Sequence, residues 1–88
     1  MTLSEIYFTE QFHKDYKTLT LTKQAAIKRA LHRLRENMRY PSLRVKKMEG
    51  REDIWEASPS RELRMTLKFE SEIITMRTCG HHDDALGR

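Results

Sequence analysis

The chain has 88 residues, of which 38% are hydrophobic and 34% charged, and its 17 Lys and Arg against 13 Asp and Glu give a net charge of +4. This length suits one domain over residues 1–88, and the composition excludes an obligately disordered chain or a long coiled coil. The lone cysteine excludes an internal disulfide, and no apolar run reaches the roughly 18 residues of a membrane span. Met1–Glu10 does not have the form of a signal peptide, so we expect a cytoplasmic protein with no membrane partner.

The N-terminal part predicts a strand followed by a first helix. Glu5–Phe8 is a β-prone run, and Thr9 can cap a helix with its side-chain oxygen. Phe12, Tyr16 and Leu19 then recur at helical spacing.

A second, longer helix is predicted over Thr22–Met38, with Thr22 as its cap and Pro41 preventing its continuation. Its apolar stripe consists of Ile27, Leu31, Leu34 and Met38, with Ala26 and Ala30 beside it.

Basic residues are concentrated in and just after this helix. Between Thr22 and Lys47 the only acid is Glu36, and the basic residues are Lys23, Lys28, Arg29, Arg33, Arg35, Arg39, Arg44, Lys46 and Lys47. Such a block suits a polyanion such as nucleic acid or an acidic protein partner, whereas the alternative is a solvated helix face that maintains solubility.

After Pro41 the pattern becomes that of strands. We expect strands at Leu43–Lys46, Ile54–Ser58, Leu63–Phe69 and Ile73–Cys79, with a tight hairpin over residues 70–72 and a strand end at Gly80. The fold class is therefore α+β in two layers, with the N-terminal strand and two helices on one face of a three- or four-stranded antiparallel sheet. Because Leu63 and Met65 take the core side, Arg64 is expected on the open face.

Six residues stand out as candidates for chemistry, each with a plainer alternative. His81 and His82 follow Gly80 and can act as acid or base, or ligate a metal with Cys79, Asp83 and Asp84, or belong to a polar tail.

Arg64 is either a phosphate clamp or an ordinary exposed sheet residue. Trp55 is either a core or interface residue or a base-stacking platform. Glu56 is by default a solvated carboxylate, and we interpret Cys79 as buried and inert.

The chain resembles the RelE/ParE superfamily, the toxins of bacterial type II toxin–antitoxin systems. The resemblance covers nearly the whole chain and rests on five segments in order: residues 12–19, 45–50, 54–57, 63–67 and 80–83. Of these, Leu63-Arg64-Met65-Thr66-Leu67 is similar to the family strand that carries a near-universal arginine, and Gly80-His81-His82 is similar to the ending Gly-x-His.

The resemblance implies a ribosome-dependent mRNA endonuclease that uses neither metal nor cofactor. In such members the 2′-hydroxyl attacks the adjacent phosphate, which restricts the substrate to RNA and requires a base, a cation and an acid. By this resemblance the catalytic residues are Arg64, His82 and Glu56, since Glu56 and Ser58 replace the lysines of other members and no tyrosine follows Gly80. The RNA-binding candidates are Arg44, Lys46, Lys47, Trp55, Arg61 and His81.

Two other functions share this resemblance. The chain can be a ParE-like inhibitor of DNA gyrase, which would not need His82, or a catalytically inactive relative that only binds its antitoxin. All three imply a cognate antitoxin, whose acidic or amphipathic segment is expected on the basic helix and the apolar groove beside it. The first also implies the ribosome and mRNA as partners.

Overall fold

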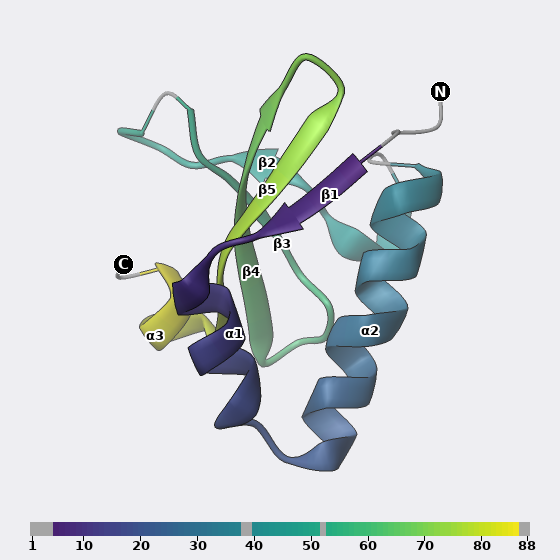
Figure 1. Ribbon diagram of the computed structural model, residues 1–88, viewed down its shortest axis with the longest axis vertical. Helices are drawn as coiled ribbons and strands as arrows, with labels where there is room; N and C mark the ends of the chain where they lie inside the picture. Colours follow the sequence, from purple (N-terminus) through teal and green to yellow (C-terminus); the bar gives the residue numbers. More distant parts are fainter. Residues whose placement is uncertain (1–4, 38–39, 52, 87–88) are drawn as a thin grey trace.

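The computed structural model describes residues 5–37, 40–51 and 53–86 (Figure 1). In chain order its elements are β1 (Glu5–Phe8), α1 (Glu10–Lys17), α2 (Leu21–Glu36), the short 3₁₀ helix η1 (Pro41–Leu43), β2 (Lys46–Lys47), β3 (Trp55–Ala57), β4 (Leu63–Glu70), β5 (Ile73–His81) and α3 (His82–Leu86). The α+β prediction is confirmed, although Met38, which was predicted to end the second helix, lies outside the described residues.

Threonine caps begin both long helices. The Thr9 side chain accepts a hydrogen bond from the Phe12 amide, as predicted. The cap of α2 is Thr20 instead of Thr22, and its side chain accepts from the Lys23 amide at 3.3 Å. The prediction was wrong by two residues because either threonine satisfies the local chemistry of a cap, and the loop after α1 decides where the next helix begins.

The sheet has five strands in the order β1-β5-β4-β3-β2, more than the three or four that we expected. The difference comes from β1, which does not remain apart from the sheet but pairs with β5 in parallel, from Glu5 opposite Ile73 to Phe8 opposite Met76. The other neighbours pair antiparallel. The β4–β5 hairpin turns at Ser71 and Glu72, which lie within the turn that the sequence predicted.

Two predicted strand boundaries are wrong. The expected strand Leu43–Lys46 is replaced by η1 and by Arg44 in the left-handed conformation, at φ 48°, so that β2 holds only Lys46–Lys47. Gly80 does not end β5, because a glycine tolerates its φ of 143° while its pairing with Arg64 continues the ladder to His81.

The core lies between the sheet and the two long helices. From the helices it includes Phe12, Ile27, Ala30 and Leu34, and from the sheet Ala57, Leu63, Met65, Leu67, Ile74, Met76 and Cys79. Cys79 is buried, as predicted. We call the sheet face toward α1 and α2 the helix face and the opposite one the second face. The second face is not fully open, because α3 packs on β4 and β5 there and buries Ala85, Thr66 and Thr78.

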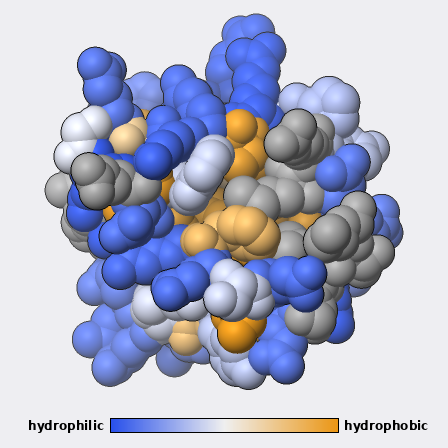
Figure 2. Space-filling model, turned by 90° about the horizontal axis from the view of Figure 1, so that it is seen from above, coloured by the Kyte–Doolittle hydropathy of each residue, from blue (hydrophilic) through white to orange (hydrophobic). Residues whose placement is uncertain are grey.

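Seen from above, the surface is largely hydrophilic, with apolar side chains gathered near its centre (Figure 2). Among the exposed large apolar residues are Tyr7 and Phe8 of β1 and Phe69 and Ile73 near the hairpin turn. Within the described ranges, no helix is long and apolar enough to span a bilayer.

Candidate active site

A row of polar residues crosses four strands on the second face. Lys46 lies opposite Glu56, Glu56 opposite Thr66, and Thr66 opposite Thr78. Residues directly opposite one another in a ladder point to the same face, so the four side chains lie next to each other. Glu56 is 7% exposed, and its Oε1 is 3.2 Å from Nζ of the exposed Lys46. This polar row places a mostly buried carboxylate beside a cation.

A β-bulge adds an arginine to the polar row. Thr66 pairs with Thr78 and the next residue, Leu67, pairs with Met76, so Arg77 has no opposite residue on β4. A bulge re-aims a side chain, and the Arg77 guanidinium donates from Nη1 to Thr66 Oγ1 at 3.2 Å. Sequence reasoning missed Arg77, because strict alternation from the buried Cys79 puts it on the helix face. No local pattern in residues 73–79 signals the bulge.

Arg77 lies near a second guanidinium group, that of Arg51. Its pKa is lowered from the ordinary arginine value, first by partial burial and second by the charge of Arg51. Arg51 lies in the turn between β2 and β3, where its amide donates to the Met48 carbonyl at 3.2 Å. Two guanidinium groups near enough to affect one another raise the local positive potential, which favours a bound anion such as a phosphodiester.

Arg64 lies on the second face, two residues before Thr66 on β4, as the alternation predicted. It is half-buried and pairs with Gly80 in the ladder. Its Nη1 lies within hydrogen-bond distance of three carbonyl oxygens, those of Ser60 at 3.2 Å, Arg61 at 3.1 Å and Leu63 at 2.8 Å. Arg64 therefore fastens the loop between β3 and β4, and among the described residues Nε and Nη2 keep no protein acceptor.

His82 begins α3 directly after β5. Its amide donates to the Glu62 carbonyl at 3.1 Å, which fixes the start of the helix beside the loop that Arg64 holds. Its Nδ1 is 2.7 Å from Oδ1 of Asp83, and its side chain is 52% exposed. This pairing occupies Nδ1–H and leaves Nε2 for another partner.

Similar solved structures have the same architecture. A RelBE2 toxin–antitoxin complex from Mycobacterium tuberculosis matches with a TM-score of 0.76 and 18% identity, covering 93% of this chain and 94% of that one. YafQ from E. coli matches with 0.75 and 15% identity, covering 90% and 93%, and a RelB–RelE complex from Methanococcus jannaschii with 0.74 and 18%, covering 92% and 95%. The chain has the RelE-like fold. By sequence alone it matches no protein-family model and no curated protein.

The RelE-like fold separates the other predicted site residues from the polar row. His81 lies on the helix side, where its Nε2 accepts from Lys23 Nζ at 3.0 Å. Trp55 lies opposite Leu67 and is half-buried against the core, and Lys47, opposite Trp55, shares that face. Arg44 and Arg61 are exposed in loops before β2 and β4. Only Lys46 among the RNA-binding candidates belongs to the polar row.

Glu56, Arg77 and Arg64 lie on the second face of this RelE-like fold, and His82 begins the short helix that packs on the same face. A carboxylate can accept a proton, guanidinium groups can hold an anion, and an imidazole can donate or accept a proton. Within the described part of the chain, no three His, Cys, Asp or Glu residues are grouped to hold a metal ion, and the side chain of Asp84 lies outside that part.

Proposed function

We propose that the chain is the toxin of a toxin–antitoxin pair and that its second face cleaves RNA. The observation that carries this proposal is the bulge that turns Arg77 onto the same face as Glu56. The shared fold with RelE and YafQ supports the toxin assignment. A mostly buried carboxylate beside a cation, on the face that the Arg77 guanidinium also reaches, suits a reaction in which a proton is removed beside a phosphate.

The reaction divides among the residues as follows. Glu56 takes the proton from a ribose 2′-hydroxyl, and the 2′-oxygen forms a bond to the adjacent phosphorus. Arg77 and Arg64 stabilise the additional negative charge on the phosphorane oxygens. The bond from phosphorus to the 5′-oxygen then breaks, and His82 donates a proton to that oxygen. The products are a 2′,3′-cyclic phosphate and a 5′-hydroxyl end, so that only RNA can serve as substrate.

The basic surface supports binding to the ribosome and mRNA. Lys28, Arg29 and Arg35 on α2 and Lys46 and Lys47 on β2 are exposed, so their charges are available to phosphates. A ribosome-bound substrate would place the protein in the cytoplasm. We expect binding to weaken steeply with added salt, since each phosphate contact releases counterions.

A reconstituted translation reaction with a reporter mRNA tests this function. Primer extension should reveal new 5′ ends with the wild-type chain and ribosomes, and about 100-fold fewer with Glu56→Gln, because general acid–base catalysis contributes about that factor or more. Glu70→Gln, at the exposed end of β4, is the matched control and should cleave like wild type. Intact mRNA with the wild-type chain would refute the nuclease, and a supercoiling assay would then test the gyrase alternative.

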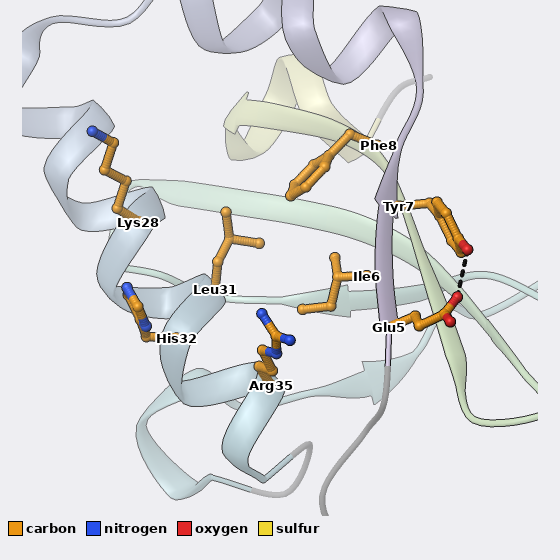
Figure 3. A pocket seen from close by; sticks show the side chains of 8 residues that line it. All are labelled: Glu5, Ile6, Tyr7, Phe8, Lys28, Leu31, His32 and Arg35. Atoms are coloured by element: carbon orange, nitrogen blue, oxygen red, sulfur yellow. Dashed lines mark hydrogen bonds between the residues drawn. The ribbon is translucent and has the colours of Figure 1, made fainter.

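The groove between β1 and α2 is the proposed binding site of the antitoxin (Figure 3). It measures about 400 Å³, and Ile6, Phe8 and Leu31 provide apolar side chains in it. Lys28, His32 and Arg35 line it along α2, while Glu5 and Tyr7 point to the other side of β1. β1 is also an edge strand of the sheet. An extended segment with apolar and acidic side chains therefore matches the groove in shape and in charge.

Co-elution with a co-expressed antitoxin on size-exclusion chromatography tests whether the antitoxin binds in this groove. Phe8→Asp with Lys28→Glu should abolish co-elution, because it places negative charge on both sides of the groove. Lys68→Glu, on the exposed part of β4, repeats the charge reversal of Lys28→Glu away from the groove and should leave the complex intact. Equal retention of the antitoxin by both variants would place the interface elsewhere.

A further inference from the structure

Thr66 and Thr78 bring two hydroxyl groups into a nearly solvent-free position on the second face. Thr66 is 0% and Thr78 3% exposed, and their Oγ1 atoms are hydrogen-bonded to one another across the β4–β5 ladder. A buried hydroxyl without a partner is costly, so removing one hydroxyl of such a pair leaves the other with an unsatisfied hydrogen bond.

The neighbours of this pair fix the direction of every hydrogen bond in it. The Arg77 guanidinium can only donate, so Thr66 Oγ1 accepts from Nη1 at 3.2 Å. The Ala85 carbonyl can only accept, so the single proton of the Thr78 hydroxyl is donated to it at 3.1 Å. The bond between the two threonines must then run from Thr66 to Thr78. The result is one directed hydroxyl chain, from Arg77 through Thr66 and Thr78 to Ala85.

The two ends of the hydroxyl chain belong to separate parts of the proposed site. At one end is Arg77, which the bulge places over the polar row. At the other end is α3, which begins with His82 and has only five residues. A helix this short is not stable alone, so its position depends on its contacts with β4 and β5.

We infer that Thr66 and Thr78 are positioning residues, which hold Arg77 and α3 in one fixed arrangement. Neither threonine is required to contact the RNA. Removal of the Thr78 hydroxyl deprives the Ala85 carbonyl of its donor and the Thr66 hydroxyl of its acceptor, so both ends of the hydroxyl chain loosen. Removal of the Thr66 hydroxyl takes away the acceptor that joins Arg77 to the hydroxyl chain. Only the expected effect on catalysis rests on the proposed function. The positions of Arg77 and α3 can be tested whether or not the chain cleaves RNA.

Isosteric variants test the arrangement without an activity assay. Thr78→Val keeps the shape but removes the hydroxyl, and Thr78→Ser keeps the hydroxyl. Thr75→Val is the matched control, because Thr75 is on the same strand and has no side-chain hydrogen bond to the described residues. Hydrogen exchange at the His82 amide should become about tenfold faster in Thr78→Val, the factor expected for one lost hydrogen bond, and remain unchanged in Thr78→Ser and Thr75→Val.

The Arg77 guanidinium gives the second readout. Its Nη resonances, assigned by NMR with Arg77→Lys, should shift in Thr66→Val, which removes the Thr66 acceptor, and stay unchanged in Thr75→Val. Unchanged His82 exchange in Thr78→Val, or an unchanged Arg77 signal in Thr66→Val, would overturn the inference whether or not the chain cleaves RNA. Faster His82 exchange in a folded Thr78→Val and a changed Arg77 signal in a folded Thr66→Val would support the inference even if wild type left mRNA intact, and intact mRNA would then refute only the nuclease.

If the nuclease is confirmed, the same variants separate positioning from binding. Thr78→Val should lower kcat by about 10- to 100-fold with little change in KM, since small misplacements of catalytic groups cost about this much. Thr78→Ser should recover most of the loss. An increase in KM alone would contradict a positioning role.

Discussion

Lys46 and Glu56 face one another across the β2–β3 ladder, with Nζ 3.2 Å from Oε1. The lysine side chain is 72% exposed and that of the glutamate 9%, so the pair has one member in solvent and one within the sheet. An exposed cation can exchange its partner for an RNA phosphate at little cost. Under the proposed function, an RNA phosphate takes the place of Glu56 as the partner of Lys46 when the substrate binds.

Charge removal at Lys46 should therefore affect RNA binding more than catalysis. Lys46→Gln is expected to raise KM about tenfold, with a smaller change in kcat, because it removes one phosphate contact and leaves Glu56, Arg77 and His82 in place. Salt titration of RNA binding should show a slope reduced by about one relative to wild type. A fall in kcat with unchanged KM would assign Lys46 to the chemical step.

Arg77 and Arg64 should respond differently to substitution. Arg77→Lys is expected to fold normally but to lose most of the cleavage activity, since an ammonium cannot provide the two-pronged contact of a guanidinium to phosphate. Arg64→Ala should also lower the free energy of unfolding by about 1 kcal/mol, because the loop between β3 and β4 loses its donor to three carbonyls. Urea denaturation beside primer extension separates these outcomes, and equal stability losses in both variants would contradict the distinction.

Local chemistry explains why the sequence predicted some of these features. The cap at Thr9 and the alternation of β4 depend on neighbouring residues, and both are confirmed. The side on which Arg64 lies follows from the same alternation. The pairing of β1 with β5, by contrast, joins residues far apart in the chain, and no property of Glu5–Phe8 by itself shows whether that strand enters the sheet.

The candidate site was predictable only where successive side chains of a strand point to opposite faces of the sheet. Arg77 was missed because the bulge depends on the pairing of β5 with β4 and on Thr9, whose amide and hydroxyl donate to the carbonyls of Met76 and Arg77. The resemblance assigned His82 to catalysis and its neighbour His81 to RNA binding, and β5 ends between them. His81 therefore faces α2, and His82 begins α3.

Thr9 should stabilise the protein more than an ordinary helix cap. Its hydroxyl accepts from Phe12 and also donates to the Arg77 carbonyl at 2.8 Å, so Thr9→Val removes a cap and a support of the bulge together. We expect a loss of about 2 kcal/mol in the free energy of unfolding. Thr20→Val, which removes only the α2 cap, should cost about 1 kcal/mol. Equal losses in the two variants would show that the bulge does not depend on Thr9.

The Tyr7 phenol should titrate above the ordinary tyrosine value. Its pKa is raised because the hydroxyl donates a hydrogen bond to the Glu5 carboxylate, whose negative charge also disfavours the phenolate. The stabilising contribution is therefore present below pH 10 or so, and it is lost as the pH rises through the higher pKa of the folded state. Absorbance at 295 nm, with Tyr7→Phe as the reference, should show a midpoint that falls in Glu5→Gln. An unchanged midpoint in that variant would contradict the contact.

Residues that favour the backbone conformation of the turn between β4 and β5 should stabilise the protein. Ser71 and Glu72 have φ values of 50° and 66°, and neither is a glycine. Two consecutive positive φ values define the hairpin turn for which Asn-Gly is preferred, because other residues adopt this region at a cost. Ser71→Asn combined with Glu72→Gly should raise the free energy of unfolding by about 1 kcal/mol. Cleavage should remain at the wild-type level, since the last pair before the turn, Glu70 opposite Ile73, lies six rungs along the ladder from Arg64. A destabilised double variant would show that Ser71 and Glu72 make contacts that outweigh their backbone cost.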